Sequence, residues 1–188
     1  MHDDLCGLPG GFSRALLGIE HATSRGCTVR TNTVVTTRNY RLLAVTVGRV
    51  IAAGASHVNI SSLMPAGRAA ADTALMPRYD VVAPHVAAAV RVAFDHNVAA
   101  TLEGFPSCAV PDFAHLCLAR DERHGDQITC LIHGKVWQNH DSHVAATCKA
   151  KRASCASCAL GDGCGGVYGP YVQMHGWDEF QPQAAAAA

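Results

Sequence analysis

Three cysteines lie within ten residues near the end of the 188-residue chain, in the pattern Cys155-x2-Cys158-x5-Cys164. A C-x2-C loop lets two thiolates face one metal centre, and the glycines around it free the backbone to wrap that centre and to offer N–H groups to its sulfurs. A fourth thiolate must come from elsewhere, and Cys148 and Cys108 are the candidates. The spacing predicts an iron–sulfur site. Structural zinc shares the C-x2-C loop and stays open as an alternative, as do free thiols in a loop.

Other residues that could do chemistry are given weaker interpretations. Gly161-x-Gly163-x-x-Gly166 matches a dinucleotide fingerprint, but it follows no strand and contains a cluster cysteine, so we treat it as a false match. His140 and His143 could bind metal, yet their polar surroundings favour solvated side chains. Four scattered cysteines have apolar neighbours and are predicted to be small core residues. These are Cys6, Cys27, Cys117 and Cys130.

Composition narrows the class of protein and its compartment. The chain has 15 basic and 15 acidic residues, and its densest basic stretch, residues 149–152, holds only three charges, so we expect no nucleic-acid partner. No run of apolar residues is long enough to predict a membrane span. The polar, acidic start resembles no signal peptide, and nine cysteines cannot all pair. We therefore expect thiols and metal ligands in a reducing, cytoplasmic location.

The elements that must position these residues alternate along the first half of the chain. Strands are predicted over residues 29–37, 57–63 and 98–102. Helices are predicted over 12–25, 40–53 and 78–96, the second ending at Gly54 and the third delayed or kinked by Pro84. One face of the last helix carries Val82, Val86, Ala89, Val90 and Ala93. This order predicts an α/β fold with a parallel sheet: a partial TIM-like barrel of about three βα units.

Residues 1–106 are assigned to the partial barrel, and 107–150 to a connecting segment with a small hairpin that turns at His133-Gly134. Residues 151–182 form an irregular cysteine-rich extension that is too poor in apolar residues to build its own core, and 183–188 is an uninformative tail. Three parallel strands would leave two sheet edges open, so we expect the chain to be part of a larger barrel.

Polar residues within the predicted strands are candidate ligand contacts. Asn32, Asn59 and Ser61 interrupt apolar, β-branched runs, and Glu103 ends the third strand. Barrel enzymes place ligand contacts at inward-facing positions near these strand ends. Simple alternation with the polar side facing water remains the alternative for each of the first three.

Together these pieces resemble the radical S-adenosylmethionine (radical SAM) family, with a tail similar to SPASM-type auxiliary-cluster extensions. In the tail the resemblance rests on Cys155-x2-Cys158-x5-Cys164-Gly-Gly-Val-x3-Tyr171-x4-Gly176-Trp-x-Glu179-Phe-x-Pro182. Upstream it rests on His2-Asp3, Gly7-x-Pro9-Gly10-x-Phe12, Gly18-Ile19, Thr31-Asn32-Thr-Val-Val-Thr36-x2-Asn39, Ser62-Leu-Met-Pro65-x-Gly67 and Leu102-Glu-Gly-x-Pro106-x-Cys108. The family's C-x3-C-x2-C motif is absent from the sequence. The chain then corresponds to the later part of the barrel, or to a homologue that has lost the motif.

The resemblance implies roles for the candidate residues. Asn32 would contact S-adenosylmethionine, Ser61 and Ser62 would lie near the substrate, and Glu103 with Pro106 would border the adenine end. Cys155, Cys158 and Cys164, with Cys108 or Cys148, would hold an auxiliary [4Fe–4S] cluster.

The complete enzyme would act on a small molecule or a peptide and would take electrons from a ferredoxin or flavodoxin. This chain alone, lacking the motif, is expected not to cleave S-adenosylmethionine. The competing hypothesis is a non-catalytic structural or electron-transfer module that binds zinc or an iron–sulfur cluster.

Overall fold

The computed structural model describes residues 1–117, 130–132, 135–137, 147–161 and 163–184. The chain divides into two compact units, Met1–Glu103 and Gly104–Ala188, and each is described by itself. Within the described residues no helix is both long and apolar enough to cross a membrane.

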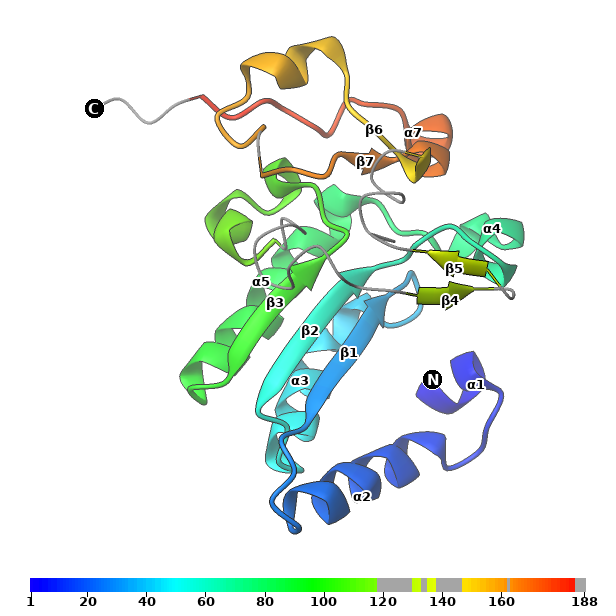
Figure 1. Ribbon diagram of the computed structural model, residues 1–188, viewed down its shortest axis with the longest axis vertical. Helices are drawn as coiled ribbons and strands as arrows, with labels where there is room; N and C mark the ends of the chain where they lie inside the picture. Colours follow the sequence, from blue (N-terminus) through cyan, green and yellow to red (C-terminus); the bar gives the residue numbers. More distant parts are fainter. Residues whose placement is uncertain (118–129, 133–134, 138–146, 162, 185–188) are drawn as a thin grey trace. The chain divides into compact units, whose positions relative to one another are not determined.

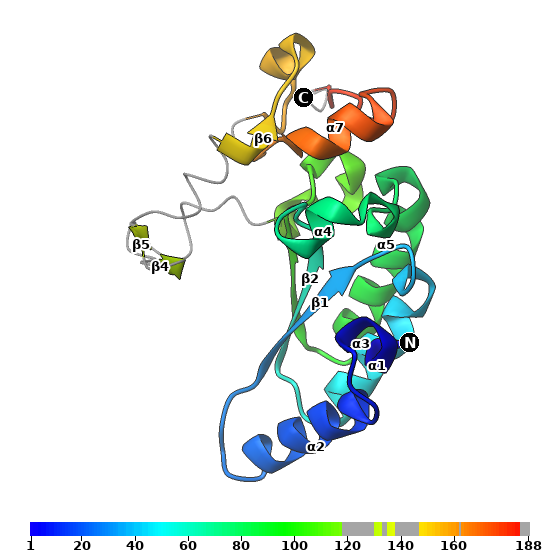
Figure 2. The ribbon, with the colours of Figure 1, turned by 90° about the vertical axis from the view of Figure 1, so that its right-hand side faces the viewer.

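The first unit is built on a three-stranded parallel sheet. Its strands are β1 (Arg30–Val35), β2 (His57–Ser62) and β3 (Ala99–Glu103), in the order β1-β2-β3. The chain passes from β1 to β2 through η1 (Tyr40–Leu42) and α3 (Leu43–Ala52), and from β2 to β3 through α4 (Arg68–Ala71), η2 (Thr73–Leu75) and α5 (Tyr79–Asp95). Both long helices, α3 and α5, lie on the same side of the sheet (Figures 1 and 2). The predicted α/β class and parallel sheet are confirmed, while the described strands form an open sheet and not a closed barrel.

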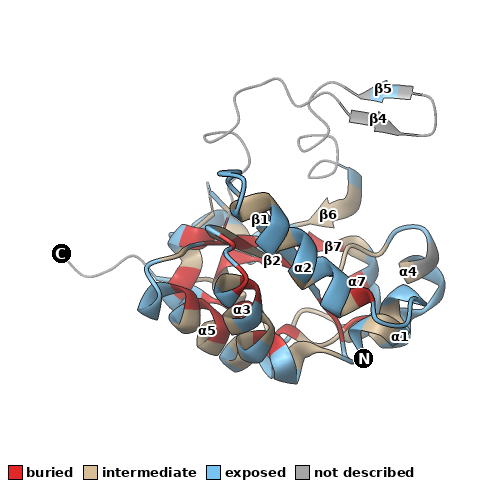
Figure 3. Ribbon diagram, turned by 90° about the horizontal axis from the view of Figure 1, so that it is seen from below, coloured by how far each residue is buried: buried red, intermediate tan, exposed pale blue. Residues whose placement is uncertain are grey.

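The core of this unit lies between the sheet and the two helices. Val58, Ile60 and Leu102 are at most 1 % exposed and alternate along their strands with polar residues. Alternate residues of a strand point to opposite faces, so the apolar ones form one face. Figure 3 shows buried stretches on α3 and α5, in contrast to α2 (Gly11–Thr23), where only Gly11 is buried.

Helix α5 has the apolar face that its sequence predicts, because all five predicted residues are buried: Val82, Val86, Ala89, Val90 and Ala93. Its start is not delayed by Pro84, which lies inside the helix. Proline removes one backbone hydrogen bond there. Buried side chains on either side of it, Val82 and Val86, keep this part of the helix against the core.

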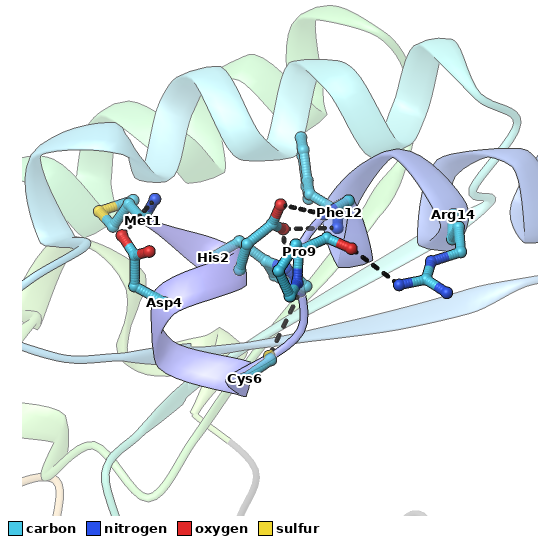
Figure 4. Close-up of polar contacts among 9 residues, drawn as sticks. Met1, His2, Asp4, Cys6, Pro9, Phe12 and Arg14 are labelled. Atoms are coloured by element: carbon cyan, nitrogen blue, oxygen red, sulfur yellow. Dashed lines mark hydrogen bonds and ion pairs between the residues drawn. The ribbon is translucent and has the colours of Figure 1, made fainter.

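Asp3 joins the two N-terminal helices, α1 (His2–Cys6) and α2. Its carboxylate accepts hydrogen bonds from the backbone N–H groups of Gly10 at 2.6 Å and Phe12 at 2.9 Å (Figure 4). These are donors that the start of a helix otherwise leaves unpaired. The bonds to the charged form, above all the one from Phe12, lower the pKa of Asp3.

The second unit contains short elements. They are η3 (Ser107–Ala109), η4 (Pro111–Leu116), β4 (Cys130–Ile132), β5 (Lys135–Trp137), β6 (Lys149–Ala150), η5 (Ala153–Ser157), β7 (Val167–Tyr168) and α7 (Gly169–His175). The antiparallel pair β4–β5 confirms the two strands of the predicted hairpin, while its turn lies outside the described residues. Buried apolar residues come from both ends of this unit, including Phe105 and Phe113 from the first part and Tyr171 and Phe180 from the last.

Two cysteine predictions are wrong. Cys6 and Cys27 are exposed, because α1, the loop after α2 and most of α2 itself lie on the surface. Cys117 is buried as expected, at 8 % exposure. Apolar neighbours in sequence are therefore a poor guide to cysteine burial in this N-terminal region.

Candidate functional site

The cysteine loop is a series of short turns whose step matches the spacing of the cysteines. The N–H of Cys158 donates to the carbonyl of Cys155 at 3.2 Å, that of Gly161 to Cys158 at 2.8 Å, and that of Cys164 to Gly161 at 3.4 Å. The first turn belongs to η5, and the backbone becomes extended at Cys158. The fourth residue at this spacing, Gly161, carries no side chain.

The three thiols and Cys108 line one hollow within the second unit. The hollow is partly open to solvent, and its wall also contains residues from the stretches 150–152, 160–167 and 177–182. All four cysteines are free and half-buried. Cys148 is not among the lining residues, and its thiol lies 3.5 Å from the hydroxyl of Thr147. Of the two candidate fourth ligands, the structure brings Cys108 to the loop.

Backbone groups already point at two of these sulfurs. The N–H of Gly166 donates to Cys164 Sγ at 3.4 Å, and the N–H of Gln183 donates to Cys158 Sγ at 3.3 Å. Hydrogen bonds of this kind stabilise a thiolate and help to set the potential of an iron–sulfur cluster.

Two glycines let the backbone approach itself closely around the hollow. A Cβ at Gly161 would lie 2.9 Å from the carbonyl oxygen of Cys158 and 3.1 Å from that of Cys155. Gly166 has a φ of +86°, and a Cβ there would lie 2.6 Å from the carbonyl oxygen of Ala150. The positive φ and the lack of space both require glycine at position 166.

Burial and the neighbouring thiols change the acidity of Cys108. Desolvation is the largest cause, followed by repulsion from negative charge on Cys164 and Cys158, and together they raise the pKa of Cys108 from 9.0 to about 11. Burial also raises the pKa of Cys117 to about 12. In the metal-free protein both groups are neutral thiols at pH 7, so a metal that binds Cys108 must displace its proton.

Basic side chains border the same hollow. Lys151 Nζ donates to the carbonyl of Gly161 at 2.8 Å. Arg152 donates through Nη2 to the carbonyl of Phe180, and its guanidinium carbon lies 6.0 Å from the centre of the Trp177 ring. Both Lys151 and Arg152 are lining residues, and the hydrogen bonds tie their charged ends to backbone carbonyls of the same unit.

In the part of the chain that the structure describes, no three His, Cys, Asp or Glu side chains form a group that could hold a metal ion.

A second group of polar residues lies on the first unit's sheet, on the face opposite its apolar core. Asn59 Nδ2 donates to Glu103 Oε2 at 2.8 Å and lies 3.3 Å from Asn32 Oδ1, which also accepts from Ser61 Oγ at 2.9 Å. Thr101 Oγ1 donates to Asn59 Oδ1 at 3.0 Å. The sequence-predicted residues Asn32, Ser61 and Glu103 are therefore joined in one network by Asn59.

This network extends to residues that sequence reasoning missed. His57 Nε2 lies 2.9 Å from Thr101 Oγ1 and 3.3 Å from Arg30 Nη2. The register of the sheet places Arg30 opposite His57, and Asn59 opposite Thr101. Each of these residues lies two or four positions from a predicted residue on the same strand. Residues at this spacing point to the same face of a sheet, so the spacing could have predicted them.

The remaining candidates are neither cysteines of the hollow nor members of the sheet network. Ser62 follows Ser61, and its buried hydroxyl has no hydrogen-bond partner among the described residues. His140 and His143 lie outside the described residues. Pro106 lines the hollow beside Cys108.

At the N-terminus the His2 ring contacts two side chains. Its Nε2 lies 3.7 Å from Cys6 Sγ, and its Nδ1 lies 3.3 Å from Asp3 Oδ1. The carboxylate of Asp3 is engaged by α2, which gives it a structural role.

Comparison with known proteins adds no relative: no family model, no curated protein and no solved structure matches this chain. The arguments about function therefore depend on the residues themselves.

Proposed function

We propose that the second unit binds a [4Fe–4S] cluster through Cys108, Cys155, Cys158 and Cys164, as the auxiliary cluster of a radical SAM-type protein. The observation that carries this proposal is that the three loop thiols and one thiol from 47 residues upstream line the same hollow. With all four irons bound by cysteine, such a cluster would supply one-electron transfer.

The chain's own residues have defined tasks in this proposal. The loop brings three cysteines to the wall of the hollow, and the N–H groups of Gly166 and Gln183 would stabilise negative charge on two of the sulfurs. Cys108 enters as a neutral thiol whose raised pKa means that it gives up a proton when the metal binds. Loading should therefore release protons and favour higher pH.

Anaerobic reconstitution with iron and sulfide tests the site. We expect about four irons and four sulfides per chain with a broad visible absorbance. Zinc without sulfide would instead support the structural-module alternative. Cys158→Ala should lose the metal of either kind, and Cys27→Ala is the matched control, because Cys27 is exposed and lies in the other unit.

We further propose that the polar face of the first unit contributes to a binding site for S-adenosylmethionine or for the substrate. The support is the network that joins Asn32, near the middle of β1, to Ser61 and Glu103, which lie near the carboxyl ends of β2 and β3. Ligands of barrel enzymes contact this end of the strands.

Calorimetric titration of the chain with S-adenosylmethionine, beside Asn32→Ala, tests this second proposal. Heat of binding that the variant loses would support it, and identical titrations of both proteins would contradict it. Because the sequence lacks C-x3-C-x2-C, we expect no 5′-deoxyadenosine under reducing, anaerobic conditions.

A further inference from the structure

Helix α1 brings a thiol, an imidazole and a carboxylate into contact on the surface of the first unit. Cys6 follows His2 by four residues, a spacing at which side chains of a helix are neighbours, and its Sγ lies 3.7 Å from His2 Nε2 (Figure 4). The other ring nitrogen, Nδ1, lies 3.3 Å from Asp3 Oδ1. A nucleophile, a base and a group that orients the base are the parts that activate a catalytic thiol.

The contact with Asp3 decides which ring nitrogen of His2 carries the proton. A carboxylate only accepts hydrogen bonds, so Nδ1 is the nitrogen that donates to Asp3, and Nε2 keeps its lone pair. Nε2 is the atom in contact with the thiol of Cys6, so it can accept the thiol proton. Asp3 is in turn held by the backbone N–H groups of Gly10 and Phe12, which fix the carboxylate from a second helix.

The other charged groups around the His2 ring are engaged elsewhere. Asp4 pairs with the N-terminal ammonium group at 3.0 Å. Arg14 of α2 donates to a backbone carbonyl at 2.8 Å. From α3, the guanidinium carbon of Arg49 lies 5.6 Å from the centre of the Phe12 ring, which is 5.3 Å from the centre of the His2 ring. The carboxylate that touches the ring is therefore the group that stabilises positive charge on it after proton transfer.

The backbone beside this group disfavours reactions that develop charge on oxygen. Acyl transfer requires N–H donors aimed at an oxyanion. At the start of α2 these donors are already used, because the N–H groups of Gly10 and Phe12 donate to Asp3 and that of Gly11 donates to the carbonyl of Leu8 at 3.0 Å. Thiol–disulfide exchange has no oxyanion, since its leaving group is a thiolate. The chemistry that fits is attack on a disulfide.

We propose that His2 activates Cys6 for exchange with small disulfides. His2 Nε2 accepts the thiol proton, and the thiolate attacks one sulfur of the disulfide R–S–S–R. The bond between the two R sulfurs breaks as the bond from Cys6 Sγ forms, and His2 returns the proton to the leaving thiolate, which departs as R–SH. Cys6 is oxidised and one sulfur of the disulfide is reduced, so no other oxidant is required. The site is independent of the cluster and of the sheet network.

Cys27 is an internal reference for this reactivity. It is exposed like Cys6 and belongs to the same unit, but its thiol makes no hydrogen bond to any residue that the structure describes. Trypsin separates the two thiols, because Arg14 and Arg25 lie between them in the sequence. Mass spectrometry of the peptides therefore measures both rates in one sample.

The test is the rate at which each cysteine of the full chain forms a mixed disulfide with glutathione disulfide. At pH 7, Cys6 should react about tenfold faster than Cys27, since a positioned base assists only Cys6. Between pH 8 and pH 6 the Cys27 rate should fall about tenfold per pH unit with the concentration of thiolate, and the Cys6 rate should fall less steeply. Equal rates with parallel pH profiles would overturn the proposal without any variant.

Two histidine variants identify the base. His2→Gln keeps a polar side chain but cannot take the proton, and it does not touch the core, because α1 has no buried residue. It should slow Cys6 about tenfold, to the rate of Cys27. His21→Gln is the matched control, an exposed histidine on α2, and should leave both rates unchanged. A Cys6 rate that His2→Gln leaves unchanged, or that His21→Gln lowers equally, would overturn the role of His2.

Discussion

Gly166 is the position at which a single methyl group should most clearly damage the proposed cluster site. Its φ of +86° lies in the left-handed region, where a residue with a side chain costs about 1–2 kcal/mol. A Cβ would also lie 2.6 Å from the carbonyl oxygen of Ala150, next to the β6–β7 pairing, and forcing such a contact apart costs about 1–3 kcal/mol more. Gly166→Ala should therefore lower the free energy of unfolding of the second unit by about 2–5 kcal/mol.

Urea unfolding of the metal-free chain measures this loss. With a denaturant slope of about 1–3 kcal/mol/M, the midpoint for the second unit should fall by on the order of 1–2 M. Cluster loading should fall as well, because the Gly166 N–H that donates to Cys164 Sγ is displaced.

Gly165→Ala is the control for this experiment. A Cβ at that position would meet only the end of the flexible Lys149 side chain, 3.3 Å away, and Gly165 does not have a positive φ in the restricted range. We expect a change within about 0.5 kcal/mol. If the two alanine variants unfold at the same urea concentration, the close approach of the backbone at Gly166 is not what shapes this loop.

Three further outcomes follow from the same contacts. Asn59→Ala should destabilise the first unit by about 1–3 kcal/mol in urea unfolding, because it removes the amide that accepts from the 3 %-exposed Thr101 and donates to Glu103. A loss below about 0.5 kcal/mol would contradict this. Leu102 is 0 % exposed, so Leu102→Ala should lower the free energy of unfolding by about 2–5 kcal/mol. Val34 is 40 % exposed, and Val34→Ala should lower it by less than about 0.5 kcal/mol. Equal losses in the two variants would count against the assigned core. Metal-free protein should lose stability as pH rises from 9 to 11. The pKa of Cys108 is raised from 9.0 to about 11 by folding, so the unfolded state releases this proton at lower pH than the folded state. Cys108→Ser should reduce the loss of stability, and parallel pH profiles of the two proteins would contradict this.

The elements of the first unit could be predicted because their residues obey local rules. Strand 29–37 and helix 78–96 were expected from β-branched composition and helical spacing, and the structure has β1 at Arg30–Val35 and α5 at Tyr79–Asp95. The sheet network could be anticipated in part: Asn32, Asn59, Ser61 and Glu103 were each expected to be ligand contacts near strand ends, while the hydrogen bonds that join them were not. The contribution of Thr101 depends on register, which no single strand reveals.

The second unit resisted prediction because its contacts join distant parts of the chain. Cys148 is seven residues from Cys155 and Cys108 is 47, yet it is Cys108 that lines the hollow. Closeness in sequence made Cys148 the nearer candidate, but the fold of the second unit decides which cysteine lines the hollow. The basic stretch before Cys155 was visible in the sequence, but its hydrogen bonds to the carbonyls of Gly161 and Phe180 are a property of packing alone.

The most direct test of the cluster site is the Mössbauer spectrum of anaerobically reconstituted protein, recorded beside Cys108→Ser and Cys148→Ser. The account predicts a [4Fe–4S] spectrum in the unchanged chain and in Cys148→Ser, with loss of one iron ligand or of the cluster in Cys108→Ser. A chain that holds no iron and sulfide, or that loses its cluster with Cys148 and keeps it without Cys108, would contradict it.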